Sequence, residues 1–219
     1  MWTNTFIILD LAFKGIIIGI AASAPMGPSG VLAVQRTLNK GRWFGFVTGV
    51  GVALSDIVYA LIAGFGLNLI LDFISNPTTG YWLQLIGSVL LCAFGWHVFH
   101  SRPAHRIAQA TGKNGTLIHN AITGFLITFS NPLIILLYLA LFARFNFIVP
   151  DHPLDQTIGF LFLLLGSLMW WYGLSYVVSK LGSRFRESGL IWTNRTIGVV
   201  VMVVSLLGFY FTLRGKALF

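Results

Sequence analysis

The stretch Gly19-Ile20-Ala21-Ala22-Ser23-Ala24-Pro25-Met26-Gly27-Pro28-Ser29-Gly30 places two prolines inside a run of small and apolar residues. Each proline lacks a backbone N–H and clashes with the preceding turn, so a helix must kink or break here. A second stretch, Gly124-Phe125-Leu126-Ile127-Thr128-Phe129-Ser130-Asn131-Pro132, has the same character. In both, a good N-cap residue precedes a proline at the first position of a new helix. We therefore expect each stretch to form two half-helices.

The composition places these stretches in a membrane protein. Of the 219 residues 56% are hydrophobic and only 9% are charged, and the mean hydropathy is +0.83. Soluble domains are about 25% charged. Because each crossing needs about 20 apolar residues, the sequence predicts six spans, near Leu11–Leu32, Phe44–Leu71, Trp82–Phe99, His119–Phe145, Thr157–Val178 and Ile197–Leu213. We expect an all-α integral membrane protein whose first and fourth transmembrane helices are broken at prolines.

Basic residues alternate between the connections that join these spans. Ten of the fourteen Lys and Arg residues follow the first, third and fifth spans, namely Arg36, Lys40, Arg42, Arg102, Arg106, Lys113, Lys180, Arg184, Arg186 and Arg195. The positive-inside rule places these connections in the cytoplasm and both termini outside. Since the basic residues set orientation in this way, the net charge of +8 does not indicate nucleic-acid binding.

The two interrupted spans are separated by three crossings, and an odd number of crossings inverts the second half. We expect one transmembrane transporter domain over residues 1–219, built as an inverted 3+3 repeat with halves of about 1–110 and 111–219. Both half-helix N-termini would then meet near the midplane, where their free N–H groups and dipoles attract a carboxylate. The predicted substrate-binding residues are Pro25, Gly27, Pro28, Ser29, Asn131 and Pro132. Ordinary proline kinks are the alternative.

Asp56 is the acidic residue that lies clearly inside a predicted span. A carboxylate at this depth costs a few kcal/mol to insert, so we expect it to face the bundle interior. Gly45, Gly49 and Ala53 recur every four residues on the same helix, which allows close helix packing. Asp56 could exchange a proton, as antiport requires, or hold a substrate ammonium group. A neutral, hydrogen-bonded Asp with a structural role is the alternative.

Metal, redox and catalytic patterns are weak in this sequence. A single cysteine, Cys92, permits neither a disulfide nor a C-x-x-C pair. His97 and His100 share a helix face, but a metal site needs three or four converging ligands, so they are interpreted as interfacial histidines. No nucleophile and base lie at one depth of the bilayer, which argues against an enzyme. We expect no cofactor and no resident metal.

The motifs together resemble the lysine-exporter (LysE-type, RhtB-like) family of amino acid translocators. The residues that carry the resemblance are Pro25-Met26-Gly27-Pro28, Lys40-Gly41-Arg42, Gly45, Gly49, Gly51, Asp56, Gly124, Asn131 and Pro132. Two departures concern the site: Met26 and Ser29 alter the usual Pro-Gly-Pro-Asn pattern, and Leu133 stands where Lys often follows Asn-Pro. The resemblance implies a six-helix exporter in a bacterial inner membrane, driven by proton motive force, with a homodimer as one option.

The leading hypothesis is a secondary active exporter of amino acids or similar small zwitterionic metabolites that works by proton antiport. Its partners would be a small-molecule substrate and the lipid bilayer. A divalent metal or other cation exporter of a related superfamily branch is the alternative, although the spans hold no cluster of His or Cys ligands. A membrane enzyme and a non-transporting assembly factor remain as further alternatives.

Overall fold

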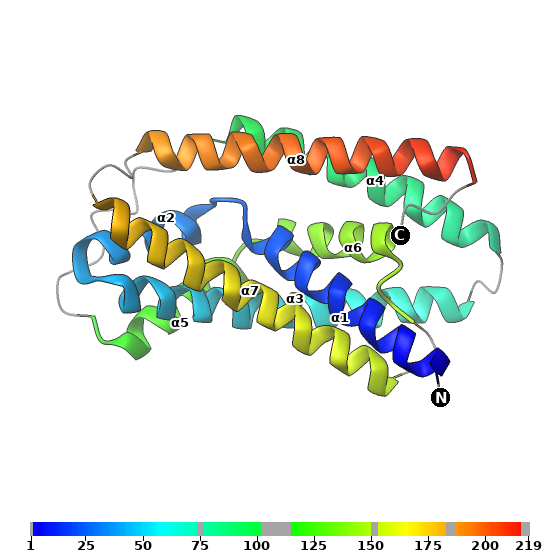
Figure 1. The fold of residues 1–219 in the computed structure, drawn as a ribbon, viewed down its shortest axis with the longest axis horizontal. Coiled ribbons are helices and arrows are strands. Elements are labelled where there is room, and N and C mark those ends of the chain that lie inside the picture. The colour runs from blue at the N-terminus through cyan, green and yellow to red at the C-terminus, as the bar shows by residue number, and fades with distance from the viewer. Residues whose placement is uncertain (1, 74–76, 102–114, 150–152, 183–186, 216–219) are drawn as a thin grey trace.

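The protein is all-helical in the part of the chain that the computed structural model describes, which comprises residues 2–73, 77–101, 115–149, 153–182 and 187–215. Its long helices run roughly parallel to the long axis of the bundle (Figure 1). The helices are α1 (Trp2–Ser23), α2 (Pro28–Lys40), α3 (Arg42–Phe73), α4 (Pro77–His100), α5 (Leu117–Phe129), α6 (Leu133–Phe145), α7 (Pro153–Leu181) and α8 (Glu187–Leu213).

The helix lengths agree with a multi-pass membrane protein. Among the described residues, the five helices α1, α3, α4, α7 and α8 are each long and apolar enough to cross a bilayer, and counting the bent pair of α5 and α6 as one span makes six. Two predicted span starts were too late, because α1 begins at Trp2 rather than Leu11 and α8 begins at Glu187 rather than Ile197. Polar residues near these two helix starts interrupt the apolar runs. A search for about 20 consecutive apolar residues therefore places the first turns of both helices in connections.

Both predicted helix breaks are present. The chain leaves α1 at Ser23 and enters α2 at Pro28, with Gly27 as an extended N-cap (φ −78°, ψ −166°). The second break separates α5 from α6, whose axes differ by 75°. There the side-chain Oδ1 of Asn131 accepts a hydrogen bond from the N–H of Leu133 (3.2 Å). The first break has the predicted arrangement, with Pro28 as the first residue of α2 after Gly27. The second differs by one position, because Pro132 is itself the N-cap of α6 and the helix begins at Leu133.

The bundle is stabilised by three closely packed pairs of helices, each with one helix from the first half of the chain and one from the second. Helix α1 packs along α7, α3 packs along α5, and α4 packs along α8. Glycines allow the approach: a Cβ at Gly19 would overlap the Leu163 carbonyl, and one at Gly124 would overlap the Thr48 carbonyl. Small residues of this kind are the usual means of close helix packing in membranes. The inverted repeat itself stays a prediction.

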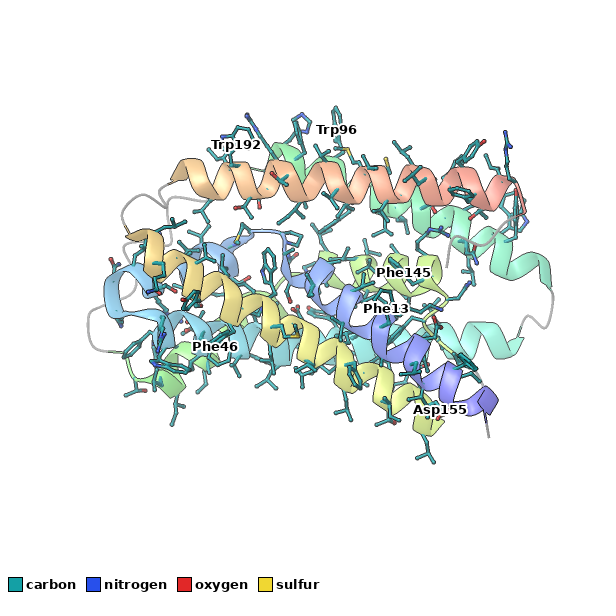
Figure 2. The ribbon with its side chains drawn as sticks, in the orientation of Figure 1. Phe13, Phe46, Trp96, Phe145, Asp155 and Trp192 are labelled. Atoms are coloured by element: carbon teal, nitrogen blue, oxygen red, sulfur yellow. The ribbon has the colours of Figure 1, made fainter. Side chains whose placement is uncertain are left out.

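The surface of the bundle is apolar, as a lipid-facing surface requires. Trp96 on α4 and Trp192 on α8 lie on the outer side of their helices and are 61% and 69% exposed (Figure 2). Phe13 on α1 is exposed to a similar extent. Because the long helices are apolar over most of their circumference, apolarity alone does not tell which of their faces is buried.

The helix ends that flank the predicted basic connections lie together at one end of the bundle. The α2–α3 turn, the end of α4, the start of α5, the end of α7 and the start of α8 are all at the left of Figure 1. We call this the basic end, because Lys40, Arg42, Lys180 and Arg195 belong to these helix ends. Arg102, Arg106, Lys113, Arg184 and Arg186 lie outside the described residues. The start of α1 and the end of α8 lie at the opposite end (Figure 1).

Candidate transport site

Both helix breaks line one cavity of about 440 Å³ within the bundle. The first break contributes Pro25, Gly27, Pro28 and Ser29, α3 contributes Asp56, and the second break contributes Asn131. The fold thus brings six of the seven predicted site residues to one place, although they are up to about a hundred positions apart in the chain. Pro132 is not among the lining residues.

The two half-helix starts at this cavity are not equivalent. In α2 the first intrahelical bond runs from the Val31 N–H to the Gly27 carbonyl (3.1 Å), so the amides of Ser29 and Gly30 precede it and have no partner within the helix. In α6 the side-chain and main-chain oxygens of Asn131 already accept the first two amides, those of Leu133 and Ile134. The start of α2 is therefore the better anion site.

Asp56 faces the interior, as predicted, and is only 3% exposed. Its Oδ2 accepts a hydrogen bond from Ser23 Oγ (3.1 Å), which lies in the last turn of α1. No cation pairs with this carboxylate among the residues that the structure describes. A second acidic residue, Asp10, also lies in a span, because α1 begins earlier than predicted. Its carboxylate pairs with the Lys14 ammonium group at an N–O distance of 2.6 Å. Asp56 is thus the carboxylate available to a ligand.

Asn194 supports the cavity wall through Met26, a role that the sequence did not reveal. From α8 it holds the peptide groups of the first break: its Oδ1 accepts from the Met26 N–H (2.7 Å), and its Nδ2 donates to the Met26 carbonyl (3.2 Å). The same Nδ2 lies 2.9 Å from Ser101 Oγ at the end of α4. In the sequence, the apolar residues before Thr193-Asn194-Arg195 are the sign that the last helix begins before the predicted start at Ile197.

Arg36 was predicted to lie in the basic connection after the first span, but it belongs to α2 and its side chain is buried at 2% exposure. Its guanidinium donates to Thr48 Oγ1 (3.0 Å), the Asn120 carbonyl (2.9 Å) and Thr123 Oγ1 (2.7 Å). These bonds join α2 to α3 and α5 near the basic end. The C-terminal part of the half-helix is therefore anchored while its start borders the cavity.

The cavity extends toward the basic end of the bundle. On α4 its lining reaches His97, Val98 and Ser101, in the last turn and just beyond the helix. His97, which the sequence suggested was only interfacial, is thus at the site. In the other direction the lining ends on α6 at Leu137. Beyond it the bundle is filled by a core cluster that includes Tyr138, Phe142, Phe145 and Phe147.

Two polar groups of the lining have no hydrogen-bond partner within the described part of the chain. Thr128 Oγ1 on α5 and Trp171 Nε1 on α7 are both buried. Buried polar atoms are normally satisfied by protein, water or ligand, and both of these atoms are inaccessible in this structure. Across the described residues no group of three or more His, Cys, Asp or Glu could hold a metal ion.

Comparisons with known proteins identify the family of this chain. The family model for LysE type translocators matches residues 20–213, which include both breaks and all of the cavity. A protein of Bacillus subtilis (strain 168), "Putative amino acid efflux protein YcgF", is 26% identical over 210 residues, covering 94% of this chain and 97% of the relative. No solved structure matches at a significant level. The chain belongs to the LysE type translocator family.

Proposed function

We propose that the protein is a secondary active exporter of amino acids or similar small zwitterions in a bacterial inner membrane. The single observation that carries the proposal is the shared cavity, which combines two helix breaks with a buried carboxylate. Such sites are typical of secondary transporters. The printed name of the Bacillus relative, an amino acid efflux protein, points to the same class of solute.

The two charged groups of an amino acid have matching partners in the cavity. The carboxylate would bind at the start of α2 beside Gly27 and Pro28, where the amides of Ser29 and Gly30 have no partner within the helix and the positive end of the helix dipole lies. Pro25 and Pro132 would serve by keeping the two breaks open. Asn131 would contribute the other half-helix start, and Asp56 would hold the ammonium group.

The direction of access follows from the charge distribution. If the positive-inside rule holds, the basic end faces the cytoplasm, and the cavity extends toward that end through His97 and Ser101. The packed cluster around Phe142 and Phe145 would close the outer half. This arrangement suits the loading step of an exporter. Release would follow a rocking of the two halves that opens the outer side and closes the inner one.

Asp56 would also couple export to the proton gradient. After release outside, the empty carboxylate would take up a proton, which neutralises a charge that is costly at this depth. Return to the inward-facing state would bring that proton to the cytoplasmic side, where a substrate ammonium replaces it. One proton would then enter for each solute exported, and a carboxyl group that binds either the proton or the substrate is sufficient for antiport.

The test is transport by purified protein in proteoliposomes with an imposed pH gradient, across a panel of amino acids and divalent metals. We expect amino acid flux that the gradient accelerates, and an Asp56→Asn variant that folds but loses this acceleration. Asp155→Asn is the matched control, because that carboxylate lies in the first turn of α7, outside the cavity.

Two results would contradict the proposal at different points. An Asp56→Asn variant with the full gradient response would remove Asp56 from the coupling. Flux of metals without flux of any amino acid would overturn the assignment of the solute.

A further inference from the structure

The lining of the cavity has a charge composition that restricts the substrate further. Of its ionisable side chains, the only acidic one is Asp56 and the only other is His97, within the part of the chain that the structure describes. The rest of the wall is polar but uncharged, or apolar. One carboxylate can neutralise one ammonium group, and in an amino acid that group is the α-ammonium.

A basic amino acid would bring a second cation into this cavity. No second carboxylate meets it there, and the start of α2 adds a partial positive charge of its own. An ion that leaves water without a partner loses several kcal/mol even after relaxation. A lysine or arginine side chain would therefore be disfavoured, whatever the affinity of the α-carboxylate and α-ammonium groups.

The remaining wall suits an apolar side chain. Phe94 on α4, Ile134 and Leu137 on α6, and Val52 on α3 border the cavity near Asp56. Trp171 adds an indole side chain from α7. Pockets of this kind bind by burying apolar surface, at about 25 cal/mol per Å².

His97 lines the cavity on the side that extends toward the basic end. It lies on α4 next to Val98, in the last turn before Ser101, and its imidazole is exposed. A neutral imidazole gives a cation no charge to pair with, and a protonated one repels it. An anionic residue at the same place would instead supply the missing second carboxylate.

We propose that the cavity selects amino acids with uncharged, apolar side chains, and that His97 is a specificity-determining residue that keeps basic amino acids out. This inference rests on the proposed function, since it concerns the solute of the same cavity. It narrows the proposed substrate from amino acids in general to those with uncharged, apolar side chains.

The experiment compares export of leucine, phenylalanine, lysine and arginine by the protein in proteoliposomes, first for the unaltered chain. We expect leucine or phenylalanine to be carried at least about tenfold faster than lysine at equal concentration, which corresponds to about 1.4 kcal/mol of discrimination. Lysine carried as fast as leucine would overturn the inference but leave the proposed function intact. Absence of flux for every amino acid would instead overturn the proposed function.

The variant His97→Asp then tests the residue itself. We expect the ratio of lysine to leucine transport to rise at least about tenfold, because the new carboxylate pairs with the side-chain ammonium. His100→Asp is the matched control: it makes the same charge change one turn further along α4, where the imidazole contacts the Trp96 carbonyl (3.0 Å) and is not part of the lining.

An unchanged ratio in a folded His97→Asp protein, or an equal rise in both variants, would refute the role of His97. A loss of structure would reduce both substrates together, whereas the ratio reports only on selectivity. If His97→Asp does not fold, Thr128→Asp places a carboxylate in the same cavity from α5, and the same rise in the ratio is expected there.

Discussion

Replacing Asn194 by alanine tests the contact that fixes the first helix break. The substitution removes the acceptor of the Met26 N–H (2.7 Å) and a donor to the Met26 carbonyl (3.2 Å). A buried backbone group left without a partner costs about 1–3 kcal/mol, so two such groups set an upper range of about 2–6 kcal/mol. Met26 borders the cavity, where water can replace part of the loss.

Measured hydrogen bonds between membrane helices set the lower limit, since they average about 0.6 kcal/mol each. We therefore expect Asn194→Ala to lower the free energy of unfolding by about 2 kcal/mol. For a chain of this length that corresponds to a fall in the melting temperature of about 4–8 °C. Transport should slow as well, because the start of α2 is no longer held in place.

The assay is thermal unfolding of the purified protein in one detergent at one heating rate, combined with transport in proteoliposomes. Ser205→Ala is the control, because Ser205 is buried on the same helix but donates only to the Met202 carbonyl of its own helix. We expect it to change the melting temperature by less than about 2 °C. Equal melting temperatures for the two variants, with normal transport in both, would show that the Asn194 contact does not stabilise the break.

Two further predictions concern packing. Gly19→Val should destabilise the protein by at least about 2 kcal/mol, because the new side chain meets the backbone of α7. Gly66→Ala on α3 should not destabilise it, because open space lies beside Gly66. Equal melting temperatures for the two variants would contradict the close contact between α1 and α7. Phe142→Ala should lower the free energy of unfolding by about 3–5 kcal/mol, because it opens a void in the core cluster. Phe13→Ala should lower it far less, because Phe13 is 61% exposed. Equal losses of stability in urea or thermal unfolding would contradict the assignment of Phe142 to the core.

The features that the sequence predicted well depend on local chemistry. Pro25, Pro28 and Pro132 lie at the two helix breaks, and the missing N–H and the ring clash that disturb a helix there are properties of the residue itself. The inward orientation of Asp56 was also predictable, since no lipid-facing position tolerates a carboxylate at low cost. Both arguments need only a few neighbouring positions in the chain.

The features that it missed depend on distant partners. Asn194 bonds Met26 across 168 positions, and Arg36 bonds Thr123 across 87. In the sequence both residues resemble the polar ends of a span, and only the packing of α8 and α2 shows that they are buried. The same holds for His97, whose position at the cavity depends on how α4 lies against the first break.

The pairing of helices between the two halves has a consequence for biosynthesis. Helix α1 ends at residue 23, and its main packing partner α7 begins at residue 153. At a synthesis rate of about 5–20 residues per second, α1 waits roughly 6–26 seconds in the bilayer before α7 emerges from the ribosome. During this interval the backbone exposed at Gly15 and Gly19 faces lipid or the insertion machinery. The nascent first half is thus the stage at which membrane chaperones and quality-control proteases would act on this chain.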